Sequence, residues 1–282
     1  MSEAYGARLG SRGLVRVSGE EAVSFLQGIV TCDVEAVGPG AAAYGALLTP
    51  QGKFLFDFFV VADGDGFLLD CNGARAGALV QRLTFYRLRA KVTIEDCSGQ
   101  YDVLGFWGGA PDLSDGLVYA DPRLAVLGWR AIVATGSDTG AETDFAGTWS
   151  DEAAYHAHRL ALGVSDGPLD LEPERSFPLE GNLQDLHGID FQKGCYIGQE
   201  VTSRSHRRGK LRKRLMPVII SGALPAPGTP IMAGEKQAGE VRSGTQGRAL
   251  ALLRLDLMDQ DLIAEDARLT PDVPDWMSFP EE

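Results

Sequence analysis

FQKGCYIGQEVTSR, residues 191–204, sets a single cysteine, Cys195, between glycines at positions 194 and 198. Lys193 stands two residues before the cysteine, and polar residues follow it. A neighbouring ammonium group and backbone N–H groups that glycines leave accessible both favour the thiolate form of a cysteine. The residues alone allow two interpretations: a reactive thiol in a polar loop, or a small buried apolar side chain, which free cysteine often is.

The chain as a whole is acidic, with 26 Lys and Arg residues against 39 Asp and Glu residues and a formal charge of −13. Such a charge disfavours general binding to nucleic acids or to membrane surfaces. No stretch approaches the roughly 20 apolar residues of a membrane helix, and the first residues lack the apolar core of a signal peptide. We therefore expect a cytoplasmic protein with no membrane partner and no direct nucleic-acid binding.

The cysteines and histidines show no metal-binding pattern. The four cysteines are far apart in the sequence, without a CxxC pair, and are expected to be free thiols in a reducing compartment. The histidines lack the HxxxH spacing of a helical zinc site, and no GxSxG, P-loop or GxGxxG motif occurs. We therefore predict no metal site and no common catalytic motif.

The first half of the chain predicts short helices and antiparallel strands. Ser18, with Glu21 three residues on, fits a capping box before a helix near 22–29. Phe54, Phe56 and Phe58 alternate along a strand and predict one buried face. Further periodicities predict strands at 67–71 and 89–96 and helices at 74–88 and 150–163, with Ser150 as the N-cap of the second helix.

The second half changes character twice. Residues 164–205 are interrupted by proline and glycine, but their apolar residues favour an ordered, functional loop. After Gly209, short strands separated by turn residues predict a small all-β domain. We place the domain limits at 1–205, which divides into two lobes near 97–105, and at 206–282.

Two further groups of polar residues could bind a ligand. Glu180, between Pro178 and Gly181, offers a carboxylate whose two oxygens suit the parallel N–H donors of a pterin or purine; a solvated loop glutamate is the alternative. Seven cations lie within the 11 residues 204–214 of this acidic chain. They suit a polyglutamyl tail, an RNA backbone or an acidic partner, or they form a solvated face.

Residues 193–200, KGCYIGQE, resemble the diagnostic motif of the YgfZ folate-binding proteins, whose mitochondrial relatives act in iron–sulfur cluster assembly. The family shares a superfamily with the glycine-cleavage T-protein, an aminomethyltransferase. Blocks such as GALLTPQGKFLFDFFV and AGEVRSGTQGRALALLRLD also resemble the family, in the right order along nearly the whole chain. The stretch from 100 to 150 is the least distinctive.

The resemblance implies an α+β fold. It consists of an aminomethyltransferase-like folate-binding domain, made of two α/β lobes with largely antiparallel sheets, and a C-terminal β-barrel. These parts would surround a central hole that holds tetrahydrofolate or another reduced one-carbon folate. By similarity Glu180 matches the T-protein glutamate that grips the pterin, while Cys195 and Lys193 match the family motif. The expected cofactor contacts are Glu180, Asn72, Tyr196 and Arg204.

One departure from the T-proteins limits the expected chemistry. T-proteins place a catalytic aspartate after an Asn-containing turn, whereas Asn72 is followed here by GARAGAL, without a carboxylate. YgfZ-type chains share this lack, so glycine cleavage is not expected and turnover as an enzyme stays uncertain. The alternatives that stay open are a folate-dependent aminomethyl or one-carbon transferase on an unidentified substrate, and an RNA-binding module.

The leading hypothesis is therefore a tetrahydrofolate-binding accessory protein for iron–sulfur cluster assembly or repair. It would affect tRNA modification indirectly, through cluster-dependent enzymes, with Cys195 as its reactive centre. Iron–sulfur assembly proteins or cluster-dependent enzymes are the expected partners, and the resemblance suggests a monomer.

Overall fold

The computed structural model describes residues 3–136, 145–209 and 211–279. The chain forms two compact units that are interleaved in sequence. We call them the sheet unit (Met1–Leu48, Phe56–Tyr155 and Leu186–Ile197) and the barrel unit (Thr49–Leu55, His156–Asp185 and Gly198–Glu282). None of the described helices is long and apolar enough to cross a membrane.

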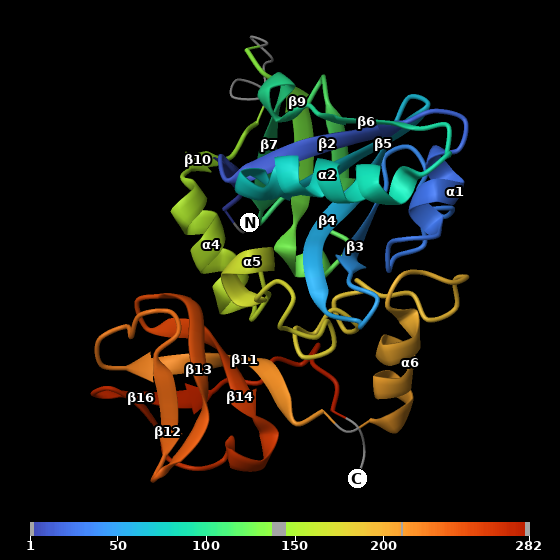
Figure 1. The fold of residues 1–282 in the computed structure, drawn as a ribbon. Helices are drawn as coiled ribbons and strands as arrows, with labels where there is room; N and C mark the ends of the chain where they lie inside the picture. Colours follow the sequence, from blue (N-terminus) through green and yellow to red (C-terminus); the bar gives the residue numbers. More distant parts are fainter. Residues whose placement is uncertain (1–2, 137–144, 210, 280–282) are drawn as a thin grey trace. The chain divides into compact units, whose positions relative to one another are not determined.

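The first sheet has five strands in the order β3-β4-β5-β2-β6, and its β4–β5, β5–β2 and β2–β6 pairs are antiparallel. Helix α2 runs along this sheet (Figure 1) and buries Ala76, Leu79 and Leu83. The strands and helices are β2 (Arg12–Ser18), α1 (Ala22–Gln27), β3 (Ala42–Leu48), β4 (Phe54–Asp63), β5 (Gly66–Asn72), α2 (Ala76–Arg87) and β6 (Thr93–Asp96). The expected order of helices and strands in this part of the chain is confirmed.

Strand β4 is buried over eight consecutive residues, so the expectation of a single buried face is wrong. One face of β4 is covered by the second sheet of the sheet unit. The ring of Phe59 lies 6.2 Å from the Tyr119 ring and 4.4 Å from the guanidinium carbon of Arg130, which both belong to that sheet. An apolar run without alternation is typical of a strand that is covered on both faces.

The second sheet has the order β10-β1-β7-β9-β8. The β1–β10 pair is parallel and the other pairs are antiparallel. The strands are β1 (Tyr5–Arg8), β7 (Tyr101–Trp107), β8 (Leu117–Ala120), β9 (Trp129–Ala134) and β10 (Thr148–Ser150). Helix α4 (Glu152–Ala161) follows β10.

Two of the predicted helix caps are wrong. Ser18 ends strand β2, and Glu21 is not part of a capping box, because its Oε2 accepts the backbone N–H of Lys91 at 2.6 Å. Helix α4 is capped by Asp151, whose Oδ1 accepts the N–H of Ala154 at 2.9 Å. The Glu21 carboxylate thus binds Lys91 instead of capping a helix, and Asp151 takes the N-cap position that the sequence suggested for Ser150.

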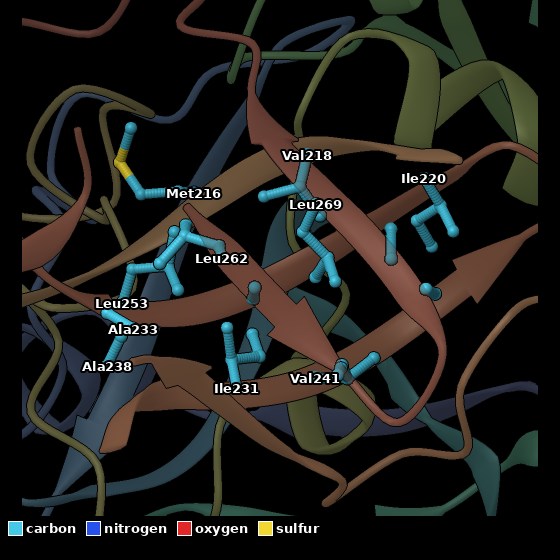
Figure 2. Close-up of a cluster of buried hydrophobic side chains, with 14 of the residues drawn as sticks. Met216, Val218, Ile220, Ile231, Ala233, Ala238, Val241, Leu253, Leu262 and Leu269 are labelled. Carbon is cyan, nitrogen blue, oxygen red and sulfur yellow. The ribbon is translucent and has the colours of Figure 1, made fainter. Parts of the chain in front are cut away.

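The barrel unit contains a closed barrel with strand order β11-β14-β13-β12-β15-β16. Figure 2 shows its core, where alternate apolar side chains such as Val218, Val241 and Leu253 gather inside. The strands are β11 (Lys213–Ser221), β12 (Pro230–Ala233), β13 (Lys236–Thr245), β14 (Arg248–Arg254), β15 (Leu262–Ala264) and β16 (Ala267–Pro271). The predicted C-terminal β-barrel is confirmed.

The segment 164–205, which was expected to be a loop, contains α5 (Gly167–Asp170) and the start of α6 (Gln199–Arg208). Helix α6 has no apolar stripe, and Thr202 is its one fully buried residue. Gly198 precedes the helix with φ +84°, a left-handed conformation that favours glycine. The expected domain limit at 205/206 falls within α6, and the limits themselves stay a prediction.

Candidate functional site

Cys195 belongs to the sheet unit and exposes its thiol, whereas the other cysteines, Cys32, Cys71 and Cys97, are buried. All four thiols are unpaired. An exposed thiol on an ordered loop can react with an electrophile, bind a metal or pair with a partner's thiol. In the described part of the chain, no group of three His, Cys, Asp or Glu side chains could by itself hold a metal ion.

Lys193 is held by the backbone that precedes strand β3. Its Nζ donates to the carbonyl oxygens of Val30 at 2.8 Å and Cys32 at 2.5 Å. Burial lowers the pKa of Lys193 below its ordinary value, against the opposing effect of nearby anionic groups. The ammonium is thus fixed by two carbonyls, and its predicted effect on the Cys195 thiol stays a prediction.

The rest of the loop is anchored to the same segment. Asp190 Oδ1 accepts the N–H groups of Gln192 and Lys193, and the Asp190 N–H donates to the carbonyl of Thr31 at 2.9 Å. The Thr31 hydroxyl in turn donates to Gly188 O at 2.6 Å. These hydrogen bonds join segments that are 157 residues apart in the sequence and hold in place the loop that carries Cys195.

Two expected cofactor contacts, Tyr196 and Asn72, have side-chain groups that could form a hydrogen bond with a ligand. The Tyr196 hydroxyl is buried and has no hydrogen-bond partner within the described ranges. Burial, together with the charge of Asp190, raises the pKa of Tyr196 to about 12, so its phenol is neutral at physiological pH. The Asn72 amide, at the end of β5, caps no helix. Buried polar groups normally find a partner, which makes the Tyr196 hydroxyl a candidate ligand contact.

Asp70, two residues before Asn72, is a buried structural residue that binds two arginines. Arg12 Nε donates to its Oδ1 at 2.6 Å, and Arg130 Nη2 donates to its Oδ2 at 2.8 Å. Burial alone would raise the pKa of Asp70, but the charges of both arginines outweigh it and hold the pKa below its ordinary value. Asp70 therefore does not replace the catalytic aspartate that residues 73–88 lack.

Glu180 lies in a hollow of about 590 Å³ in the barrel unit. Its Oε2 accepts the N–H of Phe177 at 3.2 Å, and Oε1 has no hydrogen-bond partner among the described residues. The Lys53 ammonium lies 3.2 Å from the centroid of the Phe177 ring. The hollow is lined by Phe177, Pro178, Leu179, Glu180, Thr202, Ser205, Arg208, Leu211 and Arg212.

These residues fit part of a folate. The volume falls within the roughly 300–1,000 Å³ of small-molecule sites. A carboxylate with an open oxygen suits the N–H donors of a pterin edge, and Arg208 and Arg212 suit carboxylates. Helix α6, which supplies Thr202, Ser205 and Arg208, was not predicted, and its lack of an apolar stripe left no signal in the sequence.

The basic run 204–214 does not act as one surface. Arg214 is buried, and its guanidinium binds Asn182 Oδ1 at 2.6 Å as well as Asp185 and the carbonyl of Ser278. Arg204 is exposed on α6 and pairs with Glu200 at 2.6 Å, so its expected contact with a cofactor stays a prediction. Lys210 lies outside the described residues.

Two known protein-family domains match the two ends of the chain. Residues 10–141 match the GCVT N-terminal domain, and residues 212–279 match the C-terminal beta-barrel domain of CAF17. Over its length the chain is similar to the glycine cleavage system aminomethyltransferase T from Bartonella henselae, with a TM-score of 0.80 at 15% identity, covering 98% of this chain and 87% of that one. The fold is therefore that of the aminomethyltransferase superfamily with a C-terminal barrel, as predicted.

Sequence similarity identifies the family within this superfamily. The chain is 35% identical to the mitochondrial iron–sulfur cluster assembly factor IBA57 of Mus musculus, and also to that of Homo sapiens. In each case the match covers 95% of this chain and 84% of the relative. The chain belongs to the IBA57/CAF17 family of iron–sulfur cluster assembly factors, to which the YgfZ proteins belong, and the resemblance inferred from KGCYIGQE is confirmed.

Proposed function

We propose that this chain binds a reduced folate, tetrahydrofolate or a one-carbon form of it, as part of its role in iron–sulfur cluster assembly or repair. The observation that carries the folate proposal is the carboxylate of Glu180, which faces a hollow with one oxygen unpartnered among the described residues. A second support is the superfamily fold, because the GCVT N-terminal domain matches residues 10–141.

In this proposal each expected contact has a distinct task. Glu180 of the barrel unit accepts N–H donors of the pterin. The Asn72 amide and the Tyr196 hydroxyl are hydrogen-bonding groups of the sheet unit that the family resemblance assigns to the folate. Arg204 offers a cation to the folate carboxylates. Bound folate supplies one-carbon carrier chemistry; the chain's own groups bind and orient it.

Cys195 is the proposed reactive group, and Lys193 fixes the loop that presents it. The exposed thiol would meet a cluster, a cluster-carrying partner or a partner's thiol, and tRNA modification would follow indirectly from cluster-dependent enzymes. We expect the protein to work as a monomer in the cytoplasm, a reducing compartment in which its four thiols stay unpaired. The relatives that share its family are named as mitochondrial.

The alternative, a folate-dependent one-carbon transferase, lacks a comparable observation. Residues 73–88 carry no acidic side chain, and the nearby Asp70 is neutralised by two arginines. A general base for aminomethyl transfer would have to come from elsewhere. We therefore favour an accessory role over turnover.

Calorimetric titration with tetrahydrofolate tests the folate proposal. The wild type should bind, and Glu180→Gln should bind at least about tenfold more weakly, because it loses a charge-assisted acceptor while keeping its shape. Glu265→Gln, at an exposed glutamate of the barrel outside the hollow, is the matched control and should bind like the wild type. Absence of binding to any reduced folate by the wild type would remove the folate proposal.

A further inference from the structure

Two neighbouring hollows lie on the outer surface of the barrel unit, with volumes of about 580 Å³ and 520 Å³. They adjoin, because Lys213 and Arg254 line both. We call them together the barrel groove. Its charged lining residues are Arg175, Arg212, Lys213, Lys236, Arg254, Glu240 and Asp256.

The barrel groove has an excess of positive charge in a chain of net charge −13. Five of its lining residues are cations and two are carboxylates, a difference of three. Arg254 pairs with Asp256 at 2.6 Å, whereas Lys213 and Lys236 form no ion pair with any described residue. Unpaired cations that surround a hollow favour an anionic ligand.

The strand register brings two of these cations together. Lys213 on β11 is directly opposite Arg254 on β14, so both side chains emerge on the same face of the barrel. Like charges in such a pair destabilise a sheet unless an anion lies between them. The next pair on the same face, Leu215 and Leu252, is apolar, and Leu215 is fully buried.

The floor of the barrel groove is apolar. Leu211, Leu252 and Leu255 line it and are half-buried. No aromatic side chain is among the residues that line either hollow, so bases would have no ring on which to stack. A ligand that combines carboxylates with apolar side chains fits this lining better than a nucleic acid does.

We propose that the barrel groove binds an acidic segment of a partner protein, in which carboxylates alternate with apolar side chains. The carboxylates meet Lys213, Lys236 and Arg254, and the apolar side chains lie on the leucine floor. Leu211 and Arg212 line both the barrel groove and the Glu180 hollow, but neither Lys213 nor Lys236 lines the Glu180 hollow, so this docking surface goes beyond the proposed folate site.

Fluorescence anisotropy tests the proposal with a fluorescein-labelled peptide of about ten residues that alternates Glu and Leu. The wild type should bind it, with affinity that falls as salt rises. The double variant Lys213→Gln/Lys236→Gln should bind about tenfold more weakly. Arg268→Gln, which removes an exposed barrel cation paired with Asp261, is the matched control and should bind like the wild type.

Three results would overturn the proposal. The first is absence of peptide binding to the wild type, and the second is a double variant that binds the peptide as tightly as the wild type. The third is an oligouridine of equal charge that binds as tightly as the peptide, which would make the groove a nucleic-acid surface. The double variant should keep its thermal midpoint and its tetrahydrofolate affinity, so failure of this proposal is distinct from failure of the folate proposal.

Discussion

The ion-pair cluster around Asp70 in the sheet unit and the hollows that Arg212 and Lys213 line in the barrel unit use the same charged residue types in opposite ways. In the sheet unit, Asp70 is buried between Arg12 and Arg130, and each of these three charges has a partner. In the barrel unit, Arg212 and Lys213 line hollows without an ion pair to any described residue. The difference teaches that partners, and not residue type, separate a structural charge from one that is available to a ligand.

The contrast recurs within one run of sequence. Arg214 lies two residues from Arg212, yet it is buried and bound to Asn182 and Asp185. Arg212 lies before β11 begins at Lys213, whereas Arg214 lies within the strand and its side chain is buried. Substitutions at Arg212 and Arg214 should therefore change the free energy of unfolding by different amounts.

The largest contrast should appear among the thiols. Burial raises the pKa of Cys32 and of Cys71 to about 12, and the thiolate is the reactive form. Iodoacetamide should therefore modify Cys195 about a thousandfold faster than either buried cysteine. Mass spectrometry of the native protein should show one adduct, at Cys195; early modification of Cys32 would contradict the buried environment described here.

Asp70→Asn should produce the largest loss of stability. It leaves Arg12 and Arg130 buried without their counter-ion, and breaking a buried pair in this way costs about 3–5 kcal/mol. Urea denaturation measures the free energy of unfolding. Asp261→Asn, in an exposed ion pair of the barrel, is the control and should leave the free energy of unfolding almost unchanged. Equal losses at Asp70 and Asp261 would contradict the claim that the buried ion pairs stabilise the fold more than the exposed one.

Arg214→Gln should destabilise the barrel unit by about 2–3 kcal/mol, because Asn182 and Asp185 lose a buried charged donor. Arg212→Gln should change the free energy of unfolding very little, since Arg212 is exposed and forms no ion pair with any described residue. Urea denaturation of both variants gives the difference. A larger loss for Arg212→Gln would contradict the division of the basic run.

Acid should reduce the stability that Asp70 contributes. The folded-state pKa of Asp70 lies below its unfolded value, so its stabilisation is complete above the unfolded pKa of about 4 and is lost as pH falls through the folded pKa. The stability difference between wild type and Asp70→Asn should therefore shrink below about pH 4. A difference that grew in acid would show that the pKa of Asp70 is raised instead.

Local patterns predicted much of this architecture, and distant partners explain what they missed. The β-barrel and most helices and strands follow from alternation and periodicity, and the family follows from KGCYIGQE. Helix α6 escaped prediction because Thr202 alone is fully buried and no apolar stripe marks it. The capping box failed because Glu21 binds Lys91, 70 residues away.

The sequence supplies candidate site residues, which stay a prediction, but it does not supply their contacts. The sequence places Lys193 near Cys195, yet the carbonyls that hold its ammonium belong to Val30 and Cys32, more than 160 residues earlier. The open oxygen of Glu180 likewise depends on which neighbours the fold supplies. Only the three-dimensional contacts distinguish a fixed ammonium from a free one.

The most direct test of the central claim is the activity of [4Fe–4S] enzymes in cells that lack this protein, measured under oxidative stress. We predict that activity falls, that the wild-type gene restores it, and that Glu180→Gln and Cys195→Ser do not, while the exposed-surface control Glu265→Gln does. Full enzyme activity in cells without the protein, or full rescue by both site variants, would contradict the account.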